Sequence, residues 1–214
     1  KVNLHEDEQN VLSEILKIGT SAGGARPKAV IAYNKKSGEI RSGQTIVPKG
    51  FEHWLLKLDG VSDAQFGLSH GFGRVEYAYH LMARDCNIQM MDCELLEENG
   101  RAHFMTKRFD RDGDNVRHHV QTFCGIQHFD YNNLYGYSYE QLFQTMRILR
   151  LTYPEAEQMF RRMVFNVMAT NFDDHTKNFS FMLKQDGKWE LSPAYDVCYS
   201  YDPNNVWVSQ HSLS

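Results

Sequence analysis

Apolar and polar residues alternate or form short apolar runs in the first half of the chain, and both patterns are typical of strands. Each run is bounded by turn residues such as Asn, Gly and Ser. The clearest turn is Glu98-Asn99-Gly100, which predicts a hairpin between two apolar runs. The expected strands lie at residues 29–33, after the polar turn at 34–38, at 53–58, and at 89–97 and 101–109 on either side of the hairpin turn.

Apolar side chains in the second half recur three and four residues apart, which predicts helices. Two long helices are expected at residues 139–150 and 154–170, and Pro154 suits the first turn of the second. A polar loop follows at 171–177. Two shorter helices, at 8–17 and 73–85, and a second hairpin, at 179–183 and 189–191, complete the expected elements.

The two halves therefore differ in the elements that they predict. A chain of 214 residues is long enough to bury a sizeable core. Strands gathered in one half and helices in the other favour segregated layers over alternating β-α units. We predict an α+β fold of two lobes, with a strand-rich N-lobe at residues 1–109 and a helical C-lobe at residues 110–214.

Composition and charge exclude several classes of protein. The net charge of −4 does not favour direct binding to nucleic acid, which needs a basic face. The apolar runs all fall well short of the roughly 18 residues of a membrane span, and the polar first eight residues lack the apolar core of a signal peptide. The four cysteines form no C-x-x-C pair, which favours reduced thiols. We expect a cytoplasmic protein without membrane association.

The most informative segment for function is the polar loop after the second long helix. Asp173 and Asn178 have the D-x-x-x-x-N spacing of protein-kinase catalytic loops. In such loops the Asp accepts the proton of the attacking hydroxyl, and the Asn presents an oxygen to a metal ion. Asp196 lies downstream, after the second hairpin, where a second metal ligand is needed. Hard oxygen donors of this kind are what Mg²⁺ prefers.

Residues upstream of this loop fit a nucleotide. Lys57 lies within an apolar strand, and a lysine buried there needs an anion, which a nucleotide phosphate would supply. Glu76, on the following helix, could hold Lys57 by a salt bridge. Gly23 and Gly24 let backbone N–H groups approach a phosphate closely.

Each of these features also has a structural explanation. Lys57 could extend from an edge strand into solvent, and Glu76 could be a solvated helix charge. The glycine pair could be a turn, Asp173 a helix-capping residue and Asp196 a turn residue near Pro193. Their order along the chain, on the expected element types, favours the kinase interpretation.

Four segments of the sequence resemble the HipA family of bacterial toxin kinases, and the resemblance covers nearly the whole chain. It implies a divergent kinase-like fold and a Ser/Thr protein kinase that uses ATP and Mg²⁺. It also implies a protein substrate such as an aminoacyl-tRNA synthetase, a role in dormancy and persistence, and restraint by a DNA-binding antitoxin. The matching segments are Ser21-Ala-Gly-Gly-Ala-Arg-Pro-Lys28, Lys107-Arg-Phe-Asp-Arg111, Asp173-Asp-His-Thr-Lys-Asn-Phe-Ser180 and Ser192-Pro-Ala-Tyr-Asp-Val197.

The resemblance also implies a role for each matched residue. Asp173 would be the catalytic base, with Asn178 and Asp196 as the metal ligands. Residues from both predicted lobes would bind the nucleotide. Those implied contacts are Lys57 to the α and β phosphates, His175 and Lys177 along the phosphates, Phe109 in the hinge at adenine, Asp110 at the ribose, and Ser21, or alternatively Thr20, as the site of autophosphorylation.

The chain departs from the family's usual pattern at several points. Relatives often have Glu in place of Lys107 and Gly in place of Asp174. An extra acid at 174 would raise the pKa of the base or help to bind metal. Full-length relatives carry an N-terminal subdomain and further C-terminal helices, so we expect a fragment of a longer protein. Two alternatives remain open: a small-molecule kinase, and a non-catalytic module that binds nucleotide or antitoxin.

Overall fold

The computed structural model describes residues 2–3, 26–62, 65–66, 68–98 and 100–213. The chain divides into two compact units. Unit 1 contains Lys1–Ala78 and Met91–Arg117, and unit 2 contains Tyr79–Met90 and His118–Ser214. The division falls within one helix, α2 (Phe72–Asp85). The predicted lobe boundary at residues 109–110 stays a prediction.

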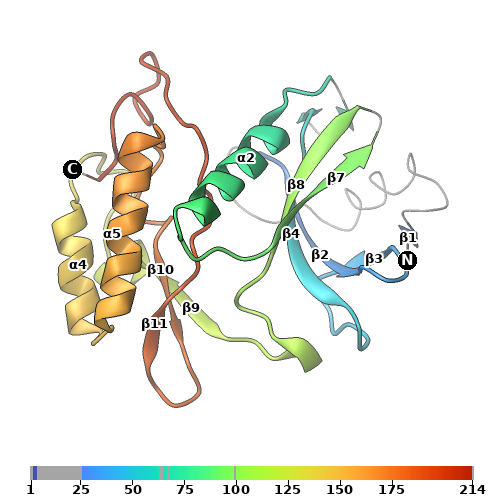
Figure 1. Cartoon of the computed structure of the whole chain (residues 1–214), viewed down its shortest axis with the longest axis horizontal. Coiled ribbons are helices and arrows are strands. Elements are labelled where there is room, and N and C mark those ends of the chain that lie inside the picture. The colour runs from blue at the N-terminus through green and yellow to red at the C-terminus, as the bar shows by residue number, and fades with distance from the viewer. Residues whose placement is uncertain (1, 4–25, 63–64, 67, 99, 214) are drawn as a thin grey trace. The chain divides into compact units, whose positions relative to one another are not determined.

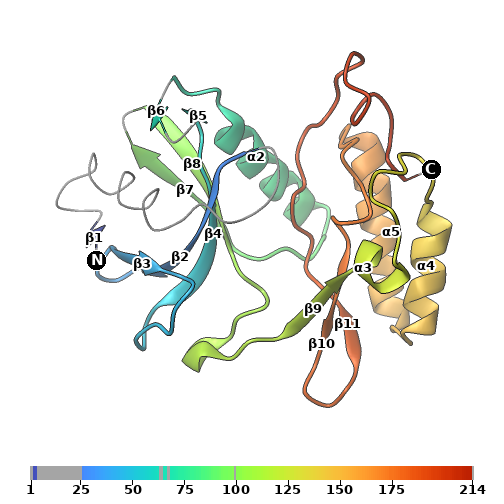
Figure 2. The same cartoon turned by 180° about the vertical axis from the view of Figure 1, so that it is seen from behind.

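A six-stranded antiparallel sheet forms the centre of unit 1, in the order β1-β3-β2-β4-β8-β7 (Figures 1 and 2). Its strands confirm the predicted runs at 29–33 and 53–58, the strand after the turn at 34–38, and the hairpin across Asn99-Gly100. Two further short strands, β5 and β6, pair with each other. The strands are β1 (Val2–Asn3), β2 (Lys28–Asn34), β3 (Glu39–Ser42), β4 (Glu52–Lys57), β5 (Val61–Ser62), β6 (Gln65–Phe66), β7 (Cys93–Glu98) and β8 (Arg101–Lys107).

The central strand β4 places an ammonium group beside the core of unit 1. Side chains alternate between the two faces of a strand. Trp54 and Leu56 are fully buried on one face, where they pack in the core cluster. Lys57 follows at the end of β4 and is itself buried, with 7% of its surface exposed. The other members of the core cluster are Ala29, Ile31, Ile40, Leu58 and Met105.

Helix α2 approaches strand β8 closely at its first turn. A Cβ atom on Gly73 would lie 1.9 Å from the carbonyl oxygen of Ala102, so only glycine fits there. The helix confirms the prediction at residues 73–85. The close approach brings the first turns of α2 next to the strands that carry Lys57 and its neighbours in unit 1.

Unit 2 contains two long helices, α4 (Tyr139–Ile148) and α5 (Tyr153–Met168), which confirm the predictions at 139–150 and 154–170. Both begin at a capping box, which satisfies backbone N–H groups that the first turn leaves free. In α4 the pair is Ser138 and Gln141. In α5, Glu155 Oε2 accepts a hydrogen bond from the backbone N–H of Thr152 at 2.7 Å.

A three-stranded sheet in the order β11-β10-β9 packs with these helices in unit 2. The predicted hairpin at 179–191 forms β10 (Ser180–Leu183) and β11 (Trp189–Leu191). The third strand, β9 (His119–Thr122), was not predicted, because its sequence is largely polar and it is defined by pairing with β10. The short helix α3 (Phe123–Gln127) of unit 2 was not predicted either. In unit 1, the strands β1, β5 and β6 and a 3₁₀ turn at Gly113–Asn115 were also not predicted.

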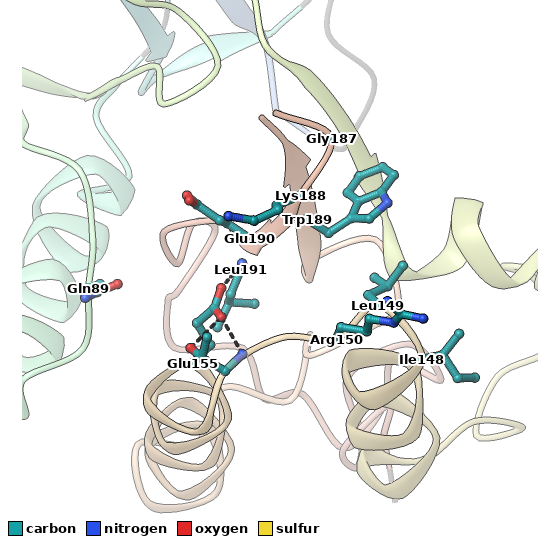
Figure 3. A pocket seen from close by; sticks show the side chains of 11 residues that line it. Gln89, Ile148, Leu149, Arg150, Glu155, Gly187, Lys188, Trp189, Glu190 and Leu191 are labelled. Atoms are coloured by element: carbon teal, nitrogen blue, oxygen red, sulfur yellow. Dashed lines mark hydrogen bonds between the residues drawn. The ribbon is translucent and has the colours of Figure 1, made fainter. Parts of the chain in front are cut away.

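A groove of about 830 Å³ lies between the β10–β11 hairpin and the α4–α5 connection (Figure 3). Glu155 spans it, because its Oε1 accepts a hydrogen bond from the backbone N–H of Leu191 at 2.8 Å. The residues that line this groove include none of the site residues that the sequence predicts. Within the described residues, no helix has the length and apolar character needed to cross a membrane.

Candidate functional site

In unit 1, Lys57 and Glu76 form a buried ion pair. The Nζ atom of Lys57 lies 2.5 Å from Oε1 of Glu76, and Glu76 has 3% of its surface exposed. Lys57 ends β4, and Glu76 lies near the start of α2. A second cation, Arg26, lies 4.0 Å from the other carboxylate oxygen of Glu76. The structure thus contains the predicted salt bridge, and the role of Lys57 toward a nucleotide stays a prediction.

The carboxylate of Asp110 is held by two arginines. Arg108 donates to its two oxygens at 2.7 and 2.6 Å, and Arg111 donates to Oδ2 at 2.5 Å. Burial raises the pKa of Asp110, but the hydrogen bonds and charges of the two arginines outweigh it and lower the pKa below its usual value. Phe109 lies in the same turn and is half-buried. The proposed contacts of these residues with ribose and adenine stay predictions.

The catalytic-loop residues of unit 2 lie in a compact turn after α5. Asp173 has 41% of its side chain exposed, and its Oδ1 lies 3.6 Å from Nε2 of His175. The side-chain amide of Asn178 donates to the backbone carbonyl of Asp173 at 2.7 Å. The carboxylate of Asp173 is therefore accessible while its backbone is held in place by Asn178.

Asn178 and Asp196 line one small cavity of about 20 Å³. Because a carbonyl oxygen only accepts, the Nδ2 of Asn178 must face Asp173, which leaves the amide oxygen for another ligand. Asp196 has a left-handed backbone with φ of 55°. That conformation costs roughly 1–2 kcal/mol for a residue other than glycine, and such costs gather at functional sites.

This pair of oxygen donors fits Mg²⁺. The ion is usually bound by one or two protein carboxylates, with water and substrate phosphates completing its shell. Among the described residues there is no cluster of three or more His, Cys, Asp or Glu side chains suited to a metal. An all-protein metal cage of that kind is therefore not present in the described part of the chain, and the binding of Mg²⁺ and ATP stays a prediction.

His175 and Lys177 lie against Tyr131. The Nζ atom of Lys177 is 3.4 Å from the centre of the Tyr131 ring, and His175 meets the same ring edge-on at 5.1 Å. The backbone carbonyl of Lys177 accepts a hydrogen bond from the hydroxyl of Tyr195 at 2.8 Å. Burial raises the pKa of Tyr195 to about 12, so this hydroxyl keeps its proton and remains a donor.

Asp174 faces inward and lines the same small cavity as Asn178 and Asp196, so the metal-binding role considered for it from the sequence stays a prediction. Its side chain is 1% exposed. Oδ2 accepts a hydrogen bond from Tyr139 at 2.7 Å and lies 3.0 Å from Nδ1 of His211, and Oδ1 accepts from the backbone N–H of Ser212 at 2.8 Å. A buried carboxylate with three partners stabilises the loop.

The hydrogen bonds continue from Asp174 into α5 as a buried polar network. Asn166 donates to the hydroxyl of Tyr139 at 3.0 Å, and Asn171 donates to Asn166 at 2.9 Å. Nearby, buried Arg162 donates to the backbone carbonyl of Ser192 at 2.8 Å, next to the segment that carries Asp196. The sequence reasoning missed this network. Its only local signal was three polar residues, 162, 166 and 171, at spacings of four and five.

Several predicted residues lie outside the described part of the chain. They are the two glycines that were expected to approach a phosphate and the two candidate sites of autophosphorylation. The glycines are Gly23 and Gly24, and the candidate sites of autophosphorylation are Ser21 and Thr20. The helix expected at residues 8–17 also lies outside the described residues.

The profile of one protein family, the HipA-like C-terminal domain, matches residues 20–214. No curated protein sequence matches the chain.

Two solved structures resemble this one. HipA of Shewanella oneidensis MR-1, in a complex with HipB and operator DNA, is 19% identical with a TM-score of 0.69, over 91% of this chain and 47% of that chain. The proinflammatory kinase CtkA of Helicobacter pylori is 12% identical with a TM-score of 0.52, over 69% of this chain and 52% of that one. The chain thus spans about half the length of each. At these identities the likeness concerns the fold, and it confirms the predicted α+β, kinase-like fold.

Proposed function

The chain belongs to the family of HipA-like C-terminal domains, and from this premise we propose that it is a Ser/Thr protein kinase that uses ATP and Mg²⁺. The observation that carries the proposal is the arrangement of Asp173, Asn178 and Asp196 in unit 2. The carboxylate of Asp173 is accessible, its backbone carbonyl accepts a hydrogen bond from the amide of Asn178, and Asn178 lines a cavity together with a second carboxylate, that of Asp196. These are the groups that phosphoryl transfer needs, in kinase order along the chain.

In the proposed reaction, Asp173 orients the hydroxyl of a Ser or Thr side chain and accepts its proton. The hydroxyl oxygen forms a bond to the γ-phosphorus, and the bond from that phosphorus to the β–γ bridging oxygen breaks, so that ADP leaves. Asn178 and Asp196 would hold Mg²⁺, which neutralises charge on the transferring phosphoryl group. Most of the rate gain comes from position and electrostatics.

The nucleotide would be bound largely by residues that already have partners. Lys57, held by Glu76, would contact the α and β phosphates, and His175 and Lys177 would lie along the phosphate chain. A buried Lys–Glu pair suits this role, because the carboxylate keeps the ammonium charged and oriented. The remaining proposed contacts are Phe109 at adenine, Asp110 at the ribose, and Gly23 and Gly24 at the phosphates.

Regulation and partners are proposed from the family. Ser21 would be a site of autophosphorylation. The Shewanella protein was solved with HipB and operator DNA, which supports a DNA-binding antitoxin as the partner of this chain. The proposed substrate is a protein, with an aminoacyl-tRNA synthetase as the first candidate to test.

The test is transfer of ³²P from [γ-³²P]ATP, with Mg²⁺, to the chain itself and to candidate proteins. Asp173→Asn and Asp196→Asn should each lower transfer by about 10²–10⁴-fold. Asp186→Asn is the matched control. This aspartate is exposed in the β10–β11 turn, where its Oδ1 accepts from the backbone of Lys188, a bond that Asn keeps.

Nucleotide binding is measured in parallel by calorimetry. If the wild-type chain binds ATP but transfers no phosphate to any protein, the kinase proposal is wrong and a nucleotide-binding module remains. If small hydroxyl compounds accept phosphate while proteins do not, the chain is a small-molecule kinase. Wild-type transfer by Asp173→Asn would show that another group acts as the base.

A further inference from the structure

A loop at residues 199–210 is attached at both ends to the catalytic loop. At its start, the backbone N–H of Phe172 donates to the carbonyl of Ser200 at 3.0 Å. At its end, the backbone N–H of Ser212 donates to Asp174 at 2.8 Å, and the Ser212 hydroxyl donates to the carbonyl of Phe172 at 3.3 Å. Both ends therefore bond to Phe172, and the second end also bonds to Asp174, so the ends of the loop are held beside the two neighbours of Asp173.

This loop places one aromatic ring against a chain of contacts that leads to the candidate base. Trp207 stacks on Tyr131, with ring centres 5.5 Å apart and planes 18° apart. Tyr131 contacts His175 edge-on, and His175 lies 3.6 Å from Asp173. Burial, and next the negative charge of Asp173, raise the pKa of Tyr131, as expected for a phenol near that carboxylate.

The same loop exposes several large apolar side chains. Trp207 is 38% exposed, Tyr201 is 42%, Tyr199 is 50% and Val206 is 59%. Of these side chains, Trp207 is the one that stacks on Tyr131, near the candidate base. Sites for small metabolites are concave and bury most of the ligand. An exposed aromatic ring such as that of Trp207 instead suits a contact with an extended polypeptide, and Trp and Tyr are among the side chains that most often anchor such contacts.

On the premise that the proposed kinase activity is correct, we propose that the exposed ring of Trp207, supported from behind by Tyr131, forms a platform for the acceptor. The acceptor is then a polypeptide segment that carries an apolar side chain close to its Ser or Thr. The acceptor hydroxyl must reach Asp173, and Trp207 is joined to Asp173 through the contacts of Tyr131 and His175. The attachment of the loop to Asp174 and Phe172 keeps the platform at a constant position relative to the base.

The experiment is phosphorylation of a positional peptide library around a central Ser or Thr by the full chain with [γ-³²P]ATP. The wild-type chain should prefer an aromatic or aliphatic residue at one position near the acceptor. Trp207→Ala should remove that preference and raise the peptide KM by about tenfold or more, with a far smaller change in the KM for ATP. Trp207→Phe keeps an aromatic ring for the stack and should restore the preference.

Tyr153→Ala is the matched control. This tyrosine is also an exposed aromatic residue of unit 2, at 83% exposure, but it lies at the start of α5. The Tyr153→Ala variant should have the same residue preference near the acceptor and the same peptide KM as the wild type. Circular dichroism checks that each variant is folded.

The possible failures can be told apart. If Trp207→Ala and the wild type transfer phosphate with the same peptide preference and KM, the platform is wrong while the kinase activity stands. The platform is equally wrong if the wild type phosphorylates itself but no library peptide, or if it prefers small hydroxyl compounds. If the wild type transfers phosphate to nothing, the proposed function fails, and the platform fails with it.

Discussion

The ammonium group of Lys57 is 2.5 Å from the carboxylate of Glu76, and the two side chains are 8% and 4% exposed. Each charge is buried only because the other neutralises it, since an isolated charge is very costly in a protein interior. The pair therefore has two separate consequences. Removing one partner changes stability, and removing the ammonium also changes what unit 1 can bind.

We predict that Lys57→Met lowers the free energy of unfolding by about 3–5 kcal/mol, because Glu76 is left buried without its closest partner. The loss of unfolding free energy should lie toward the lower end of that range, because Arg26, 4.0 Å from Glu76, still offers the carboxylate a positive charge. Urea denaturation measures the change. A loss below about 1 kcal/mol would show that the pair is solvated in solution.

The double variant Lys57→Met/Glu76→Met separates stability from function. Replacing both charges with apolar side chains of similar size is often neutral or stabilising, so most of the lost stability should return. Nucleotide binding, measured by calorimetry, should not return, because the ammonium is absent. Recovery of ATP affinity in the double variant would contradict the role proposed for Lys57.

We predict that Tyr139→Phe lowers the free energy of unfolding by about 1–3 kcal/mol. The substitution removes the hydroxyl that donates to buried Asp174 and accepts from Asn166, and buried polar groups left unsatisfied cost about that much. Urea denaturation again gives the value. The matched control is Tyr137→Phe, whose hydroxyl bonds the carbonyl of Asp130 at an exposed position, and it should cost less than about 1 kcal/mol. Equal losses of unfolding free energy in the two variants would mean that the buried network stabilises the protein no more than one exposed hydrogen bond does.

We predict that the protein loses stability as the pH falls below about 6.5, in part because of His103. Burial lowers the pKa of this fully buried histidine, although Glu98 opposes the shift. Its Nδ1 accepts a hydrogen bond from the backbone N–H of Asp59 at 2.8 Å, which needs the neutral ring. The unfolded chain therefore takes up the proton first, so the free energy of unfolding decreases as pH falls from about 6.5 toward the folded-state pKa.

The variant His103→Asn tests the assignment to this residue. An Asn oxygen can replace Nδ1 as the acceptor for Asp59, but it does not titrate, so the loss of stability between pH 7.5 and 5 should shrink. Each unit by which the pKa is lowered is worth about 1.4 kcal/mol. His70→Asn, at an exposed position, should keep the wild-type profile. An unchanged pH profile in His103→Asn would assign the effect to other groups, of which buried His53 is the next candidate because burial also lowers its pKa.

The elements that could be predicted from the sequence are those whose signals are local. Strand β4 has an apolar run, and α5 has apolar spacing, a proline in its first turn and the Thr152–Glu155 capping box. The spacing of Asp173 and Asn178 is likewise local, so the short distance between them follows from one turn of chain. These features depend on neighbours within about five residues, which a linear pattern contains.

The remaining features depend on partners that are distant in the chain. Strand β9 is a strand because it pairs with β10, some 60 residues later, although its own sequence is largely polar. Asp174 was considered as a metal ligand, yet it is buried because Tyr139 and Ser212 supply its hydrogen bonds.

The sequence by itself thus determined the order of the main elements, the kinase-like pattern of acidic and amide residues, and the candidate pair Lys57 and Glu76. The tertiary structure alone decided which polar side chains turn inward and which, such as Trp207 and Tyr131, gather on the surface beside the candidate base. The physical reason is that burial and hydrogen-bond satisfaction depend on what the folded chain brings close in space, and the sequence pattern does not contain those distances.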